Sequence, residues 1–167
     1  MKEAYISIFS NTVNTDKEEA LRNILNNVDI EFKGNKYLIY KHSQIPKGLS
    51  TIEDFKNTFL IIKKFDQLTG NYFKPIFQWA GRHNFEDILP TLKSLGYKSF
   101  RLILNEDFKI ISGHRRAVKA LERQIAKQTG VRVDRVSPST EIWILHTKDD
   151  YGFVMLKITN AKQSAKE

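Results

Sequence analysis

The stretch from Ser112 to Gly130, SGHRRAVKALERQIAKQTG, constrains the fold more than any other part of the chain. Its apolar residues fall on one face of a helix that begins near His114, at the spacing of a core stripe: Ala117, Val118, Leu121 and Ile125. The segments on either side, Ser99 to Leu104 and Glu141 to Thr147, read as strands. Strand, helix and strand in this order predict a parallel pair of strands with a right-handed crossover.

The opposite face of this helix carries cations at every fourth position from Arg115, with Arg116 beside the first of them. We call this set the basic band: Arg115, Arg116, Lys119, Arg123 and Lys127. Each step of four residues turns the helix by about 40°, so the side chains form one continuous ridge. Like charges four residues apart destabilise a helix by roughly 0.2–0.5 kcal/mol per pair, so three successive pairs cost about 1 kcal/mol. Glu122 is the one acid expected within the band to offset this cost.

A bound phosphate chain would turn this repulsion into attraction. The free amides of the helix start, at Ser112, Gly113 and His114, would add to a phosphate-binding site. Arg132 and Arg135, which follow the helix, would extend it. The other interpretation is that this face is only solvated, as most basic helix faces are.

The net charge of +8 is concentrated in the second half of the chain. From Lys98 onward, 14 Lys and Arg stand against 8 Asp and Glu, while the first 97 residues hold 13 against 11. This asymmetry indicates a nucleic acid or an acidic surface as the partner. The sequence has no cysteine, which excludes disulfides, thiolate catalysis and sulfur-ligated zinc. With no signal peptide and no apolar run of membrane length, we expect a cytoplasmic protein without a membrane partner.

The first 68 residues read as strand, helix, strand, strand, helix and strand, which is the ferredoxin-like pattern. The strands are expected at Ala4–Phe9, Ile30–Phe32, Tyr37–Tyr40 and Phe59–Phe65. Thr15 and Glu18 form a capping-box signature ahead of the first helix. The second helix, from Thr51 to Lys56, is brief.

Turn residues and breaks in the hydrophobic pattern divide the chain into four parts. We expect a ferredoxin-like domain over 1–68, a linker over 69–83, a second domain over 84–160 and a polar tail over 161–167. Aromatic residues such as Phe77 and Trp79 are interpreted as wedging the linker against its neighbour rather than stacking on unpaired bases. In the second domain, Asn84 caps a helix that Pro90 should kink or break and that Gly96 should end.

No group of residues in the sequence assembles an acid, a base and a nucleophile. The histidines fall in separate elements without metal-ligand spacing: His42, His83, His114 and His146. The pair Asp149-Asp150 reads as a hairpin turn, and neither a phosphate-binding P-loop nor a GxGxxG motif is present. We therefore expect no catalytic residues, no metal and no cofactor in this chain.

From Phe100 to Ile158 the sequence resembles a THUMP domain, the RNA-binding module of tRNA-modifying enzymes. The segments that carry the resemblance are TGVRVDRVSPSTEIWIL and the closing strand YGFVMLKI. They are similar to the TGLRVNRxxPDxEFWLL type of segment that precedes S-adenosylmethionine-dependent RNA methyltransferase domains, although Ser139-Thr140 stands where an Asp is common. A ferredoxin-like domain precedes the THUMP domain in that family. The expected fold class is therefore α+β: a ferredoxin-like domain followed by a THUMP-type α/β domain with a partly parallel sheet.

The resemblance implies an RNA-binding module, in particular for tRNA near its acceptor 3′ end, that presents RNA to a modification enzyme such as a methyltransferase. No methyltransferase domain follows within the sequence, so the chain would be either the substrate-binding part of a longer enzyme or an adaptor for a separate subunit. The residues by themselves support binding to an RNA-like polyanion. The alternative is an interaction module whose basic helix docks an acidic protein or an anionic surface.

Overall fold

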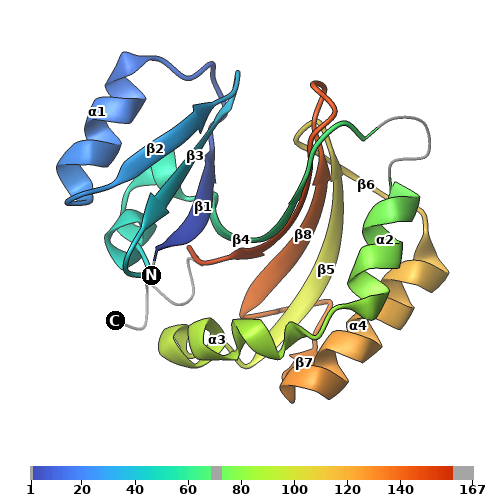
Figure 1. Ribbon diagram of the computed structural model, residues 1–167. Coiled ribbons are helices and arrows are strands. Elements are labelled where there is room, and N and C mark those ends of the chain that lie inside the picture. The colour runs from blue at the N-terminus through green and yellow to red at the C-terminus, as the bar shows by residue number, and fades with distance from the viewer. Residues whose placement is uncertain (1, 69–72, 160–167) are drawn as a thin grey trace. The chain divides into compact units, whose positions relative to one another are not determined.

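The computed structural model describes residues 2–68 and 73–159, and the chain divides into two compact units. Unit 1 is formed by residues 1–61 together with 157–167, and unit 2 by residues 62–156. Figure 1 shows the helices and strands of each. The tail expected over 161–167 lies outside the described residues. The strands β4 (Thr58–Phe65) and β9 (Gly152–Lys157) pass from one unit into the other, so the chain connects the two units twice.

Unit 1 contains an antiparallel sheet with the strand order β2-β3-β1-β4. Its elements are β1 (Glu3–Ile8), α1 (Thr15–Ile24), β2 (Asp29–Lys33), β3 (Tyr37–His42), two 3₁₀ helices η1 (Lys47–Thr51) and η2 (Glu53–Phe55), and β4 (Thr58–Phe65). With the pair of 3₁₀ helices in the place of the second helix, this is the ferredoxin-like order. The expected fold class is confirmed for this part of the chain.

Two local expectations for unit 1 differ from the structure. The helix expected from Thr51 to Lys56 is replaced by η1 and η2, because Ile52 between them is extended and no side chain caps either one. Helix α1 is capped by Asn14, whose side chain accepts a hydrogen bond from the Lys17 amide, rather than by Thr15. Asn is at least as good a cap as Thr, and it stands one residue earlier.

The core of unit 1 holds a small buried hydrogen-bond network. The Ser7 hydroxyl lies 2.7 Å from the Tyr40 hydroxyl and 2.8 Å from that of Thr58. Thr58 in turn donates to the Phe55 carbonyl. Burial raises the pKa of Tyr40 above its usual value, and burial followed by the nearby charge of Glu3 raises the pKa of Tyr5 to about 12. The side chains of Tyr5 and Tyr40 are therefore neutral at physiological pH in the core of unit 1.

Unit 2 contains a mixed sheet with the strand order β9-β8-β5-β6, and β7 also pairs with β5. Its elements are α2 (Phe73–Arg82), a 3₁₀ helix η3 (Phe85–Ile88), α3 (Leu89–Leu95), β5 (Ser99–Glu106), β6 (Lys109–Ile111), α4 (Arg115–Thr129), β7 (Arg132–Val133), β8 (Thr140–His146) and β9 (Gly152–Lys157). Strands β5 and β8 are parallel, with Phe100 opposite Thr140 and Glu106 opposite His146. This confirms the parallel pair on either side of the basic helix.

The segment expected to be a linker, 69–83, is largely helical. Residues 69–72 lie outside the described residues, and the remainder forms α2. Phe73, Ile76 and Ala80 are buried on one face of α2, and Pro75 stands in its first turn, where the missing amide proton costs nothing. The boundary at residue 83 therefore differs from the structure, in which α2 belongs to unit 2. The expected break near Pro90 is present between η3 and α3, and Gly96 ends α3 with φ 68°.

Candidate nucleic-acid interface

The basic helix α4 is held on unit 2 by a narrow apolar face. Val118, Leu121 and Ile125 are buried, as the spacing predicts. The helix begins after Gly113 and His114, which both have positive φ, and ends at Gly130 with φ 75°. Arg115–Thr129 therefore forms a helix with defined ends.

Two glutamines of α4 tie this helix to the end of α2. The Gln124 amide donates to the carbonyl of Ala80 at 2.9 Å and to that of His83 at 3.1 Å. Gln128 donates to the His83 carbonyl at 3.1 Å and accepts from the Phe85 amide at 2.9 Å. Figure 1 shows α2 and α4 side by side. These bonds satisfy backbone groups that the end of α2 and the start of η3 leave unpaired.

Glu122 does not belong to the exposed band, contrary to the sequence-based expectation. Its side chain is only 3 % exposed and accepts a hydrogen bond from the Leu102 amide of β5 at 3.0 Å. Its two carboxylate oxygens also accept from Arg135 Nη1 at 2.6 and 2.5 Å. On a helical wheel, Glu122 lies about 40° from Val118, beside the buried stripe. The carboxylate therefore compensates Arg135 and the β5 backbone, and it does not offset the charge of the basic band.

The five side chains of the basic band are all exposed: Arg115, Arg116, Lys119, Arg123 and Lys127. Within residues 2–68 and 73–159, none of them forms an ion pair with a carboxylate. No ion pair among the described residues offsets the repulsion inferred from the sequence, because the one candidate acid points elsewhere. The structure brings these five residues together on one helix face.

The two arginines expected to extend the band are placed differently from it. Arg132 is exposed and lies 3.9 Å from an Asp134 oxygen, which is a weak ion pair. Arg135 is about half exposed but is held by buried Glu122. The loop that carries Arg135 is further fixed by Arg101, which donates to the Arg135 carbonyl at 3.3 Å and pairs with Glu141 at 2.6 Å. Arg135 is therefore a fixed cation at the side of α4.

The residues expected to lend helix-start amides occupy the turn before α4. Ser112, Gly113 and His114 are all exposed. The His114 ring packs against two aromatic rings of α2, with centroids 5.4 Å from Phe73 and 6.0 Å from Phe77. Phe77 thus helps to fix the start of the basic helix, in line with the interpretation that the aromatic residues of 69–83 pack against neighbouring structure.

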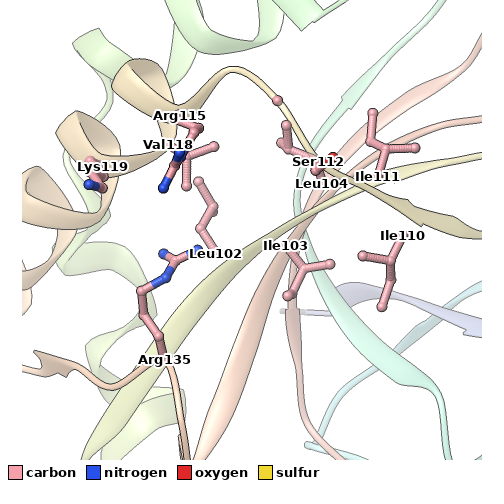
Figure 2. A pocket seen from close by; sticks show the side chains of 11 residues that line it. Leu102, Ile103, Leu104, Ile110, Ile111, Ser112, Arg115, Val118, Lys119 and Arg135 are labelled. Carbon is pink, nitrogen blue, oxygen red and sulfur yellow. The ribbon is translucent and has the colours of Figure 1, made fainter.

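A pocket of about 590 Å³ opens beside the start of α4. Its wall combines aliphatic residues of β5 and β6 with cations: Leu102, Ile103, Leu104, Ile110, Ile111, Ser112, Gly113, Arg115, Val118, Lys119 and Arg135. In Figure 2 the cations lie on the side of α4 and of the loop after β7, and the isoleucines lie on the side of β6. Ile110 is 68 % exposed at this edge of the sheet. The cations can be identified from the sequence, but the pocket cannot, because its apolar wall comes from a pair of strands.

The described part of the chain contains no group of three or more His, Asp and Glu side chains placed to hold a metal ion. None of the helices formed by residues 2–68 and 73–159 has the length and apolar character needed to cross a bilayer.

Comparison with known proteins gives structural relatives at low sequence identity. No protein-family model and no curated protein matches the sequence. Among solved structures, TrmN from Thermus thermophilus matches over 94% of this chain with a TM-score of 0.66 and 12% identity. A possible methylase from Clostridium difficile 630 matches with a TM-score of 0.58, 15% identity and the same coverage. A 4-thiouridine synthetase solved in complex with RNA and ATP matches over 94% of this chain with a TM-score of 0.51 and 17% identity.

These matches include almost every element of both units. The chain has a ferredoxin-like and THUMP-type fold. It spans less than half of each of these larger proteins: 46% of TrmN, 41% of the possible methylase and 42% of the synthetase. The THUMP-type fold therefore corresponds to one part of proteins that are more than twice as long.

Proposed function

We propose that this THUMP-type chain binds RNA, most specifically tRNA, through the basic band of α4. One observation carries the proposal: all five cations of the band are exposed, and none has a carboxylate partner among the described residues. A phosphate chain along the band would replace repulsion between successive cations by attraction. It would also supply negative charge at the positive end of the α4 dipole, beside Arg115 and Arg116.

The fold supports the same function. The 4-thiouridine synthetase that shares it was solved as an RNA complex. In the proposal, this chain presents tRNA near its acceptor end, in the cytoplasm, to a modification enzyme such as a methyltransferase. The catalytic part would be a separate subunit or another part of a longer chain. Recognition would depend on shape and phosphate positions, because the deep major groove of an A-form helix hides the base edges.

The structure suggests a ranking of the proposed contacts. The five residues of the basic band are free to bind phosphates and form the centre of the site. Arg132 and Arg135 are secondary contacts at the side of the site, because each already pairs with a carboxylate. Ser112, Gly113 and His114 complete the proposed site at the start of the helix.

The test is binding of tRNA by fluorescence anisotropy, with paired charge reversals. Arg115→Glu combined with Arg123→Glu should weaken binding by about 100-fold, because two charge-assisted contacts are lost. Lys93→Glu combined with Lys98→Glu is the matched control, since both lysines are exposed, lack ion pairs among the described residues and lie in unit 2 outside the band. This control changes the net charge equally and should retain most of the affinity.

The salt dependence gives a second readout of the same contacts. If about four phosphates are neutralised, affinity should fall by roughly two orders of magnitude between 50 and 200 mM salt. The Arg115→Glu, Arg123→Glu variant should show a shallower dependence. Equal tRNA binding by the band variant and the control variant would refute the site. Binding to an acidic protein or to anionic vesicles without any binding to RNA would favour the docking alternative.

A further inference from the structure

We propose that the pocket beside α4 binds a nucleotide that ends in a phosphomonoester. The ligand is either the 5′-phosphorylated end of a bound RNA or a free nucleoside monophosphate. The first case deepens the proposed function and rests on it, whereas the second can be tested without RNA. The proposal stands on the size of the pocket, the charge at its rim and the composition of its wall.

The size and wall of the pocket suit one nucleotide. Its volume of about 590 Å³ falls within the roughly 300–1,000 Å³ range of small-molecule sites. The side chains of Ile103, Ile110 and Ile111, which are at least partly exposed, provide an apolar surface against which a base and the carbons of a sugar can pack. This surface is open at the edge of the sheet, where Ile110 is largely exposed.

Charge at the rim distinguishes a terminal phosphate from an internal one. Arg115, Lys119 and Arg135 carry three positive charges at the rim of the pocket, and Glu122, which pairs with Arg135, carries one negative charge. The net charge of this group is about +2. A phosphomonoester carries about −1.5 to −2 charges at pH 7, whereas a phosphodiester carries one. The rim therefore matches the terminal group better than it matches a link of a continuous chain.

Arg135 is prepared for this role by its surroundings. Glu122 fixes its guanidinium through Nη1, and Arg101 holds its backbone carbonyl. A cation that is already positioned loses little side-chain entropy on binding. Arg115 and Lys119 come from successive turns of α4 and line the same pocket as Arg135.

The wall of the pocket has few groups that could distinguish adenine from uracil. Among the described residues that line it, none has a carboxylate or amide side chain that could recognise a base edge, and Ser112 supplies the one side-chain hydroxyl. We therefore expect little preference between adenine and uracil, and a strong preference for the charge state of the phosphate.

The first experiment uses mononucleotides and methyl-labelled isoleucines observed by NMR. Adenosine 5′-monophosphate should shift the methyl signals of Ile103, Ile110 and Ile111, whereas those of Ile6 and Ile39 in unit 1 should stay in place. It should bind about tenfold more tightly than its methyl phosphodiester, and adenosine should bind most weakly. Equal affinity for the ester and the monophosphate, or no shift at the pocket isoleucines, would overturn the proposal.

The variants compare two cations of the same helix. Lys119→Gln removes a pocket cation and should weaken monophosphate binding by about tenfold while reducing the preference over the ester. Arg123→Gln removes a cation one turn further along, outside the pocket, and should change this binding by less than about twofold. Both side chains are exposed, so neither change should prevent folding. Equal losses in the two variants would show diffuse attraction rather than a site and would contradict the proposal.

The RNA arm separates this inference from the proposed function. A short RNA with a 5′-phosphate should bind more tightly than the same RNA with a 5′-hydroxyl, and Lys119→Gln should remove the difference. If tRNA binds through the basic band but neither the monophosphate nor the 5′-phosphate matters, the pocket proposal fails and the proposed function stands. If the monophosphate binds but tRNA does not, the proposed function fails and the pocket is a mononucleotide site.

Discussion

Glu122 shows how a single buried carboxylate can organise a surface. Its oxygens accept hydrogen bonds from the Leu102 amide and from Arg135, so it links helix α4, strand β5 and the loop after β7. An ionised carboxylate is stable in such a place only when its oxygens are paired. Glu122 therefore does not lie on the solvent face of α4, and the charged side chains exposed on that face are all cations.

Removing the charge of Glu122 should destabilise the protein. Glu122→Gln leaves Arg135 facing an amide and weakens two charge-assisted bonds, so the free energy of unfolding should fall by about 2–3 kcal/mol. Urea denaturation followed by circular dichroism measures this change. Glu19→Gln is the control, because Glu19 is exposed on α1 and forms no ion pair among the described residues, and it should change stability by less than about 0.5 kcal/mol. Equal stability of the two variants would contradict the structural role given to Glu122.

The placement of Glu122 and of the two glutamines could not be predicted from the sequence. A glutamate among alternating cations reads as a surface ion-pair partner, since Glu is almost never fully buried unless it is paired. Its partners are a backbone amide twenty residues earlier and an arginine thirteen residues later. Gln124 and Gln128 likewise bind backbone groups at and just beyond the end of a helix that the sequence pattern does not reveal.

At the level of elements, helices with a regular apolar stripe were predictable and irregular ones were not. The helix near His114 begins at Arg115 and ends before Gly130, as expected, because its stripe and its glycine stop agree. Helix α2 is not predictable from the sequence alone, because Pro75 and the closely spaced aromatic residues around it are also typical of a linker. What makes it a helix is burial of Phe73, Ile76 and Ala80, which depends on distant parts of unit 2.

The packing of β9 against the start of unit 2 depends on a glycine. A Cβ atom at Gly152 would overlap Leu68 Cδ1 and lie 3.1 Å from Ile76 Cδ1. Gly152→Ala should therefore lower the free energy of unfolding by about 1–3 kcal/mol through overpacking. In contrast, Gly81→Ala places a methyl group in open space within α2 and should raise it by about 0.5–1 kcal/mol. Thermal unfolding of both variants checks the opposite signs, and a neutral Gly152→Ala would show that the contact relaxes freely.

At the scale of the whole molecule, unit 1 is completed by a segment that follows unit 2 in the chain. The Ile158 amide donates to the Thr58 carbonyl at 2.9 Å, and the Thr58 amide donates to the Thr159 hydroxyl at 3.1 Å. Thr159 also donates to the Lys56 carbonyl. Residues 62–156 therefore form an insertion between two parts of unit 1.

Thr159 should matter for unit 1 more than its position in the sequence suggests. Thr159→Val keeps the shape but leaves the buried Thr58 amide without its acceptor, so stability should fall by about 1–3 kcal/mol. Native-state hydrogen exchange should show the loss in the amides of β1 and β3, with a smaller effect in β5 and β8. Thr51→Val is the control, because the Thr51 hydroxyl is exposed and donates only to the Gly48 carbonyl. Uniform loss of protection in both units would contradict a local role.

This insertion has a mechanical consequence. A force that pulls Glu3 and Thr159 apart acts first on the pairing of β1 with β4, where Tyr5 lies opposite Leu60. From β4 it is transmitted to Ile158 through the hydrogen bond between the Ile158 amide and the Thr58 carbonyl. The ninety-odd residues that carry α4 and its cations lie off this route, in a loop closed by those bonds. A stretching force along the chain would thus have to break these hydrogen bonds of unit 1 before it acted on the basic helix.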